Sequence, residues 1–395
     1  MNRNTDFIAF ARPSLGEEEE EAVLRVLRSG WLTTGSETLS FEREFGEFVG
    51  TPHALAVNSA TSGLHLALEA IGIGPGDVVA TSPYTFTSTA AVVRHLGAEV
   101  AFCDVAPGSY NIDLDSLGRL LSTTKNCRAI IAVHVGGLPC DMRSIRALAK
   151  RYGCALVEDA AHSFPSVTEE GYAGTLGDVG VYSFYATKTI TTGEGGMLVT
   201  KDDRVAARAE KMRMHGFDRA AWDRYTAKKA SWRYAVTEAG FKYNMPDLLA
   251  AIGRVQLRKA NRFLEERRAI AEVYDAAFSG VPGLELPPRG EGHAWHLYSL
   301  RTRSDRGGVA RDDLVEALSE RGVGSSVHFI PLHTMPYYAE RYRLTPESFP
   351  NASSMFERTL SLPIWQGMGV GVAERVAEAV LEITGVPGSH SRRDV

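Results

Sequence analysis

The sequence has few of the features that mark secreted, membrane-spanning or nucleic-acid-binding proteins. Its 395 residues include only four cysteines, none in a CxxC pair, so neither a disulfide framework nor a zinc site is expected. No stretch approaches the roughly 20 apolar residues that cross a bilayer. The N-terminal MNRNTDFIAFARPS lacks the apolar region of a secretory signal. A net charge of −5 disfavours a dedicated nucleic-acid binder. We therefore expect a cytoplasmic protein without a nucleic-acid or membrane partner.

The chain instead has the composition of a globular protein of two domains, with 44% hydrophobic and 23% charged residues. Residues 54–200 alternate between amphipathic segments and short apolar runs, which are HALAV, DVVAT, AEVAF, AIIAV, ALVED, GVYSF and GMLVT. Strands that are apolar on both faces and alternate with helices predict an α/β fold, with a mostly parallel seven-stranded sheet sandwiched by helices. Ligands of such sheets bind where the carboxyl ends of strands lead into loops.

The pattern changes near residue 248, which divides the chain into predicted domains. Residues 1–247 would hold two N-terminal helices (EEEEEAVLRVLRSG and SFEREFGEFVG) and the sheet domain. Residues 248–386 begin with one long connecting helix, followed by mixed strands and helices, which predicts a smaller C-terminal α+β domain. Residues 387–395 are expected to form a disordered tail.

Two segments that follow predicted strands carry residues suited to anion and ring binding. NSATSG opens a helix, where Thr61 and Ser62 would join free backbone N–H groups in an anion site, although an ordinary N-cap explains the same residues. Asp159 ends the predicted strand ALVED, and His162 follows it. Asp159 could hold a heteroaromatic nitrogen protonated while His162 bonds a neighbouring oxygen, or Asp159 could cap the next helix.

Lys188 is the most specific of these signals. It lies in GVYSFYATKTITTGEGGMLVT, with no acidic residue before Glu194, so partial desolvation would lower its pKa and supply the amine of a Schiff base. A phosphate cup, a strand-end carboxylate and an amine are what pyridoxal phosphate requires. Phe86, in SPYTFTST, is placed to stack on the cofactor ring, and a core aromatic is the alternative.

The motifs, in their order, resemble those of the sugar-nucleotide aminotransferases, which are fold-type-I pyridoxal phosphate enzymes of the aspartate aminotransferase superfamily. The resemblance spans residues from about 10 to 384 and is carried by GWLTTG, NSATSGLHLAL, SPYTFTSTA, VEDAAHS, SFYATKTITTGEGGMLVT, MHGF, GFKYNM, HAWHLY and HFIPLH. It implies a pyridoxal 5′-phosphate enzyme whose cofactor alternates with pyridoxamine 5′-phosphate.

The resemblance also implies roles for individual residues. Lys188 would bond the cofactor and move the substrate proton, Asp159 would pair with the pyridine nitrogen, and His162 would lie beside the phenolic oxygen. The cofactor phosphate would be bound by Thr61, Ser62 and Ser183. Asn244, in GFKYNM, would reach the cofactor phosphate of a second subunit, so the active unit would be a homodimer with shared active sites. Many relatives read closer to GYNYRM there.

The implied substrates are a nucleotide-linked keto sugar and L-glutamate, which would leave as 2-oxoglutarate. The sugar nucleotide carries a diphosphate, for which Lys242 is a candidate ligand. His328 and His333, with Tyr337 and Tyr338, could line the sugar or nucleotide pocket, and Thr33 is a further candidate for binding the substrate. The basic and aromatic segment 218–236 is a further candidate, or else a surface loop. His328 and His333 form an HxxxxH pattern, but no nearby carboxylate or cysteine completes a metal site, so no metal is expected.

Within the family, GFKYNM, HAWHLY and VHFIPLHTMPYYAERY most resemble the enzymes that make UDP-4-amino-4-deoxy-L-arabinose. The prediction is amination at C4 of a UDP- or dTDP-linked 4-keto sugar, in amino-sugar biosynthesis for a polysaccharide or glycoside. A 3-keto sugar nucleotide or a keto-cyclitol is the main alternative. A pyridoxamine-dependent sugar dehydratase would carry His in place of Lys188, and a non-catalytic regulatory or binding relative would have lost this lysine.

Overall fold

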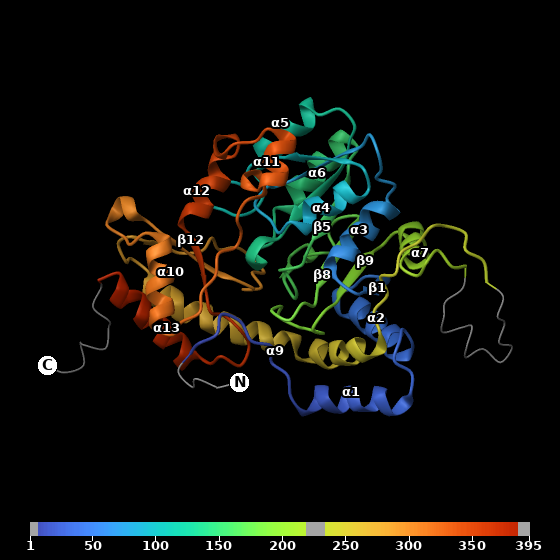
Figure 1. Ribbon diagram of the computed structural model, residues 1–395, viewed down its shortest axis with the longest axis horizontal. Coiled ribbons are helices and arrows are strands. Elements are labelled where there is room, and N and C mark those ends of the chain that lie inside the picture. The colour runs from blue at the N-terminus through green and yellow to red at the C-terminus, as the bar shows by residue number, and fades with distance from the viewer. Residues whose placement is uncertain (1–6, 219–233, 386–395) are drawn as a thin grey trace.

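A seven-stranded sheet forms the centre of the larger part of the molecule in the computed structural model, which describes residues 7–218 and 234–385 (Figure 1). In spatial order its strands are β1 (His53–Val57), β9 (Gly196–Thr200), β8 (Val179–Ser183), β5 (Ala155–Asp159), β4 (Cys127–Val133), β2 (Val78–Thr81) and β3 (Glu99–Phe102). β9 runs antiparallel to both of its neighbours, and every other neighbouring pair is parallel. The predicted mostly parallel sheet is confirmed, and each of the seven apolar runs forms one of its strands.

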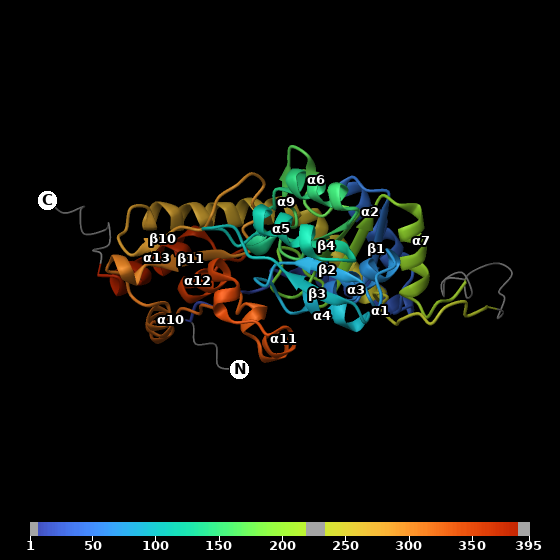
Figure 2. The same ribbon diagram turned by 90° about the horizontal axis from the view of Figure 1, so that it is seen from above.

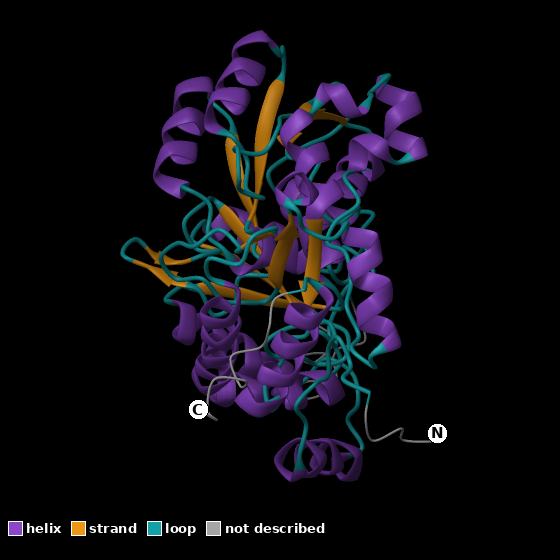
Figure 3. Cartoon of the chain, turned by 90° about the vertical axis from the view of Figure 1, so that its left-hand side faces the viewer, coloured by secondary structure: helices purple, strands orange, loops and turns teal. Residues whose placement is uncertain are grey.

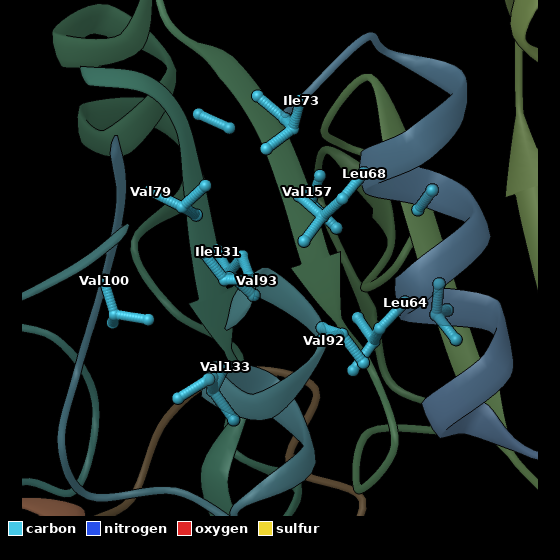
Figure 4. Close-up of a cluster of buried hydrophobic side chains, with 14 of the residues drawn as sticks. Leu64, Leu68, Ile73, Val79, Val92, Val93, Val100, Ile131, Val133 and Val157 are labelled. Atoms are coloured by element: carbon cyan, nitrogen blue, oxygen red, sulfur yellow. The ribbon is translucent and has the colours of Figure 1, made fainter. Parts of the chain in front are cut away.

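Helices cover both faces of this sheet, because successive residues of a strand point to opposite faces. On β4, Ile131 packs with α3 (Ala60–Ala70) and α4 (Ser88–His95), whereas Ile130 packs with α5 (Leu114–Thr123) and α6 (Met142–Tyr152). Figure 4 shows the first cluster, in which side chains of α3 and α4 meet Ile131 and Val157. Figure 3 shows the strands lying between sets of helices.

The 32-residue helix α9 (Asp247–Phe278) is the predicted long helix, and it runs along both parts of the molecule (Figure 1). α1 (Glu17–Ser29) lies against it through Ala22 and Val26. α2 (Ser36–Val49) packs Phe41 and Phe45 on β8 and on the residue that follows it. α7 (Asp203–Met212) follows β9 and covers the face that α3 and α4 cover.

The C-terminal part is a small α+β unit around a three-stranded antiparallel sheet, as predicted. Its strands are β10 (Leu284–Glu285), β11 (Tyr298–Thr302) and β12 (Thr359–Leu362), and its helices are α10 (Arg311–Glu320), α11 (Pro336–Tyr342), α12 (Pro350–Arg358) and α13 (Val370–Ile383). The strands, α10 and α13 share a core with Tyr274 and Phe278 of α9. The helices α11 and α12 instead pack Tyr338, Ala352 and Met355 into a core of the large sheet. Seen from above, this unit lies beside one end of α9 and the large sheet beside the other (Figure 2).

Short elements complete the fold. They are the hairpin β6 (Val167–Thr168) and β7 (Gly171–Tyr172) and the 3₁₀ turns η1 (Val135–Gly137), η2 (Ser304–Arg306), η3 (Leu332–Thr334) and η4 (Pro346–Ser348). Within residues 7–218 and 234–385, no helix is both long and apolar enough to cross a bilayer. The expected disordered tail, 387–395, lies outside the described residues, and the division into domains at residue 248 stays a prediction.

Candidate active site

A cavity of about 450 Å³ opens at the carboxyl edge of the large sheet. Its walls come from the loops after β1, β2, β5 and β8, which are parallel strands that all end at this edge. Seven of the predicted site residues line it: Thr61, Phe86, Asp159, His162, Ser183, Lys188 and His328. The C-terminal part closes the cavity with His296, His328 and Phe329.

The start of α3 forms one wall of the cavity. The hydroxyl of Ser59 accepts the N–H of Ser62 at 3.1 Å, while the Ser62 hydroxyl donates to Asn58 Oδ1 at 2.7 Å. A Cβ at Gly63 would come within 2.7 Å of Val181 on β8, so glycine lets this helix lie directly against the sheet. The segment is therefore an N-cap that also brings first-turn N–H groups and the Thr61 hydroxyl to the cavity, which suits an anion.

Asp159 is buried at the end of β5, where its carboxylate is held in place by two donors. Thr89 of α4 donates its hydroxyl to Oδ2 at 2.8 Å, and the N–H of Ala161 donates to Oδ1 at 3.2 Å. Burial raises the pKa of Asp159, while these hydrogen bonds and the charge of Lys188 act in the opposite direction. β5 is followed by turns and the β6–β7 hairpin, so Asp159 does not cap a helix.

Lys188 lies in the β8–β9 loop, where its N–H donates to the carbonyl of Tyr185 at 2.9 Å. The loop turns back at Gly193, whose φ of 83° favours glycine. Burial lowers the pKa of Lys188 to about 8; the charge of Asp159 opposes this shift and that of Arg267 adds to it. At pH 7 a lysine with this pKa is a free amine in roughly a tenth of the molecules, far more often than a lysine with the ordinary pKa.

Neutral imidazoles lie beside the lysine. His162 accepts the N–H of Gly136 at Nδ1 (3.3 Å), which places its own proton on Nε2, and its ring stacks on Phe329 at 5.5 Å. Burial lowers the pKa of His162 well below its usual range and lowers that of His328 to about 4. His328 bonds Ser361 through Nδ1 at 3.0 Å. These rings act as hydrogen-bonding groups rather than as cations.

The other predicted site residues lie outside the cavity. The hydroxyl of Ser62 is used within the α3 cap. Lys242 donates to Asn244 Oδ1 at 2.6 Å, and Asn244 donates to the Thr34 hydroxyl at 2.6 Å, in a network beside the carboxyl end of β1. Thr33 precedes Thr34 in the chain, and its carbonyl accepts the N–H of Asp247 at 3.3 Å.

Tyr337 and His333 also lie outside the cavity. The side chain of Tyr337 is 54% exposed on α11, where it contacts Tyr338 edge-on. His333 is buried against Ser353, and the described residues contain no cluster of histidine, cysteine or acidic side chains that could hold a metal. Most of the basic segment 218–236 (residues 219–233) lies outside the described part of the chain.

Sequence reasoning missed four residues that the structure adds to the site or its support: Thr89, Tyr185, His296 and Phe329. All four belong to motifs that the sequence displays, SPYTFTST, SFYATKTITTGEGGMLVT, HAWHLY and HFIPLH, but nothing in the spacing of those motifs assigns them to Asp159 or Lys188. Their proximity depends on how α4 and the C-terminal part pack on the sheet.

Comparisons with known proteins agree with this fold and site. Residues 13–381 match the model of the DegT/DnrJ/EryC1/StrS aminotransferase family. The chain is 43% identical over 386 residues to the spore coat polysaccharide biosynthesis protein SpsC of Bacillus subtilis, covering 97% of this chain and 98% of SpsC.

Two solved structures are also similar. The putative sugar aminotransferase Spr1654 of Streptococcus pneumoniae, known in PMP and PLP forms, is 27% identical; its PMP form has a TM-score of 0.88 over 96% of this chain and 99% of that one. DesI, solved in the presence of its TDP-sugar product, is 27% identical with a TM-score of 0.84 over 96% of this chain and 94% of that one.

The fold and the site define a pyridoxal phosphate enzyme of fold type I. The chain belongs to the DegT/DnrJ/EryC1/StrS aminotransferase family, and it is a pyridoxal phosphate-dependent aminotransferase. The residues present fit this cofactor: the cavity offers N–H groups for a phosphate, a buried carboxylate, a free amine and the exposed ring of Phe86.

Proposed function

We propose that this enzyme transfers the amino group of L-glutamate to C4 of a UDP- or dTDP-linked 4-keto sugar, giving the 4-amino sugar nucleotide and 2-oxoglutarate. The observation that carries the proposal is the pairing of Lys188, whose pKa is about 8, with the buried carboxylate of Asp159 in one cavity. The TDP-sugar product of DesI supports a nucleotide-linked substrate, and the name of SpsC supports a role in polysaccharide biosynthesis.

The cofactor would be held by residues from four loops. Thr61, Ser183 and the first-turn N–H groups of α3 would bind its phosphate, with Ser62 acting through the cap of that helix. Asp159 would hold the proton of the ring nitrogen, His162 would donate Nε2–H to the phenolic oxygen, and Phe86 would stack on the ring. When bound, pyridoxal phosphate supplies an aldehyde that exchanges amino groups and a ring that withdraws electrons from the reacting carbon.

Lys188 would do the proton transfer in both half-reactions. Its free amine takes the proton from Cα of glutamate in the first half, and in the second half its ammonium returns a proton to C4 of the sugar. A pKa of about 8 suits both directions, because a group that titrates near the working pH both gains and loses a proton readily.

The sugar nucleotide would reach groups outside the cavity of a single chain. We propose that Asn244 binds the cofactor phosphate of a second subunit in a homodimer with shared active sites. The substrate would contact His328 in the cavity and would also contact Thr33, Lys242 and Tyr337 outside it. The four cysteines are free thiols, which supports a reducing compartment such as the cytoplasm.

The first test is the absorbance spectrum of the purified protein before and after addition of L-glutamate. We expect a visible band from bound pyridoxal phosphate, which glutamate bleaches to the near-ultraviolet absorbance of pyridoxamine phosphate. A protein that stays colourless with added pyridoxal phosphate would overturn the assignment.

The second test uses a panel of UDP- and dTDP-linked 4-keto and 3-keto sugars, with the amino product identified by mass spectrometry. Transfer to 3-keto sugars alone would overturn C4 amination. The variant Lys188→Ala should lose turnover by about a thousandfold while it still binds the cofactor, since it removes the group that moves the proton. Normal turnover in this variant would exclude the proposed role.

A further inference from the structure

Among the residues that the structure describes, His296 makes a side-chain hydrogen bond with the amine of Lys188. Its Nε2 lies 3.4 Å from Lys188 Nζ, its side chain is buried with 6% exposure, and it lines the cavity. We propose that His296 is a positioning residue, which holds the Lys188 amine by accepting one of its N–H groups at Nε2. This inference rests on the proposed function, in which Lys188 moves the substrate proton.

The protonation of His296 allows this role. In His162 and His293, Nδ1 accepts a backbone N–H, so the single proton of each neutral ring lies on Nε2. In the part of the chain that the structure describes, Nδ1 of His296 has no partner. Its proton can therefore sit on Nδ1, which leaves Nε2 free to accept from the lysine.

The backbone of His296 is fixed by a second buried residue, Arg267 of α9. Its guanidinium donates to the carbonyls of Trp295, His296 and Ile364 at 3.0–3.2 Å. The long helix thus sets the position of the imidazole relative to the lysine, although the two belong to different parts of the fold.

The charges around the pair keep the imidazole neutral. The titratable groups that face Lys188 and His296 are Asp159 at the end of β5, His162 after it, Arg267 of α9, His328 before η3 and Glu194 before β9. Burial and the nearby cations lower the pKa of His296 well below its usual range. The ring therefore accepts from Lys188 in both protonation states of the lysine, and the lone pair of the free amine stays available for the substrate proton.

A matched pair of amide variants tests this role. In His296→Gln the amide reaches the position of Nε2, whereas in His296→Asn it reaches only that of Nδ1. The full chain is freed of cofactor with hydroxylamine, and the pKa of Lys188 is measured by competitive labelling with acetic anhydride between pH 6 and 10, read by peptide mass spectrometry.

We expect His296→Asn to lower the pKa of Lys188 by about one unit, because the ammonium loses an acceptor, and His296→Gln to restore it. With cofactor bound, His296→Asn should slow the glutamate half-reaction about tenfold and His296→Gln should recover it. The control is His333→Asn, because His333 is also buried with an unpartnered Nδ1 but lies outside the cavity. It should leave the pKa of Lys188 unchanged.

An unchanged pKa in His296→Asn, or the same fall in His333→Asn, would overturn the inference. Should His296→Asn fail to fold, as judged by its circular dichroism, His296→Phe replaces it with the same expectation. The labelling experiment needs neither amino donor nor sugar. A normal shift without amino transfer would therefore overturn only the proposed function, and amino transfer without a shift would overturn only the role of His296.

Discussion

At the scale of single residues, the carboxylate of Asp159 depends on a chain of two hydroxyl groups, from α4 and from the loop before it. Thr85 and Thr89 share a hydrogen bond of 2.8 Å, and Thr89 donates to Asp159 Oδ2 at 2.8 Å. Because this bond favours the ionised carboxylate, it opposes the effect of burial on its pKa. Thr89 is thus a small side chain with a direct effect on the charge of the site.

We predict that Thr89→Val raises the pKa of Asp159 further, by about one unit, since valine has a similar shape but no hydroxyl. Under the proposed function Asp159 must be ionised, so the acidic limb of kcat/KM against pH should move to higher pH. Thr89→Ser keeps the hydroxyl and should keep the wild-type profile. Identical profiles for the valine and serine variants would contradict this prediction.

The sequence allowed Lys188 and Asp159 to be predicted because Asp159 ends, and Lys188 follows, a strand whose apolar pattern is clear, and parallel strands end at one edge. His296 and Thr89 could not be predicted in the same way. Thr89 reaches the site from α4 and His296 reaches it from the C-terminal part. The hydrophobic periodicity of the sequence does not predict how those segments pack on the sheet. Thr33 and Asn244 were predicted as site residues, but within one chain both lie outside the cavity, bonded to Asp247 and Thr34 respectively.

At the scale of elements, the start of α2 is set by a residue far along the chain. The sequence predicts this helix from SFEREFGEFVG, but it begins four residues earlier, at Ser36. Asp247, at the start of α9, accepts the N–H groups of Gly35, Glu37 and Thr38 and the hydroxyl of Thr38. A cap that is supplied from about 210 residues away leaves no local signal.

We predict that Asp247→Ala lowers the free energy of unfolding by about 2–3 kcal/mol, because several buried donors lose their acceptor at once. Asp113→Ala, which removes the local cap of α5, should cost about 1 kcal/mol. Urea denaturation monitored by circular dichroism measures both. Equal losses in the two variants would show that the additional donors at Asp247 add nothing beyond an ordinary cap.

Glu19 joins α1 to α9 in a similar way. Glu19 is buried, with 2% of its surface exposed. Its carboxylate accepts hydrogen bonds from Gly16, Gln256 and Lys259 at 2.8–2.9 Å. Burial acts to raise the pKa of Glu19, but the hydrogen bonds from Lys259, Gln256 and Gly16 outweigh it, so the pKa is lowered from 4.5.

A carboxylate whose pKa is lower in the folded protein stabilises it above the unfolded pKa, and this contribution is lost as the pH falls through the folded pKa. We therefore predict that Glu19→Gln destabilises the protein at pH 7 by about 1–2 kcal/mol and that the difference shrinks below pH 4.5. Unfolding by urea at several pH values between 7 and 3 measures it. A difference independent of pH would assign the loss to packing.

At the scale of the whole molecule, the cavity exists only where the two parts of the chain meet. Asp159 and Lys188 come from the large sheet, whereas His296, His328 and Phe329 come from the C-terminal part. α9 contributes to the cores of both parts and fixes the backbone of His296 through Arg267. The proposed domain boundary near residue 248 thus falls at the start of the helix that holds the site together.

The proposed homodimer makes a prediction that only the whole assembly can test. Asn244 lies outside its own chain's cavity, next to a loop and helix on which the apolar side chains of Leu32 and Leu39 are each 45% exposed. If Asn244 serves the site of the partner subunit, a chain with Lys188→Ala lacks the lysine but can supply Asn244 to its partner. A chain with Asn244→Ala retains the lysine but cannot supply Asn244.

In a hybrid dimer of these two chains, one site has both Lys188 and Asn244 and the other has neither. Each variant alone should be nearly inactive, while an equal mixture that exchanges subunits freely should regain about a quarter of the wild-type activity, since half of the dimers are hybrids with one intact site. Subunit exchange is checked by affinity capture of a tagged chain. A mixture that exchanges but stays inactive would place Asn244 in the site of its own chain, because no arrangement of the two variants would then contain an intact site.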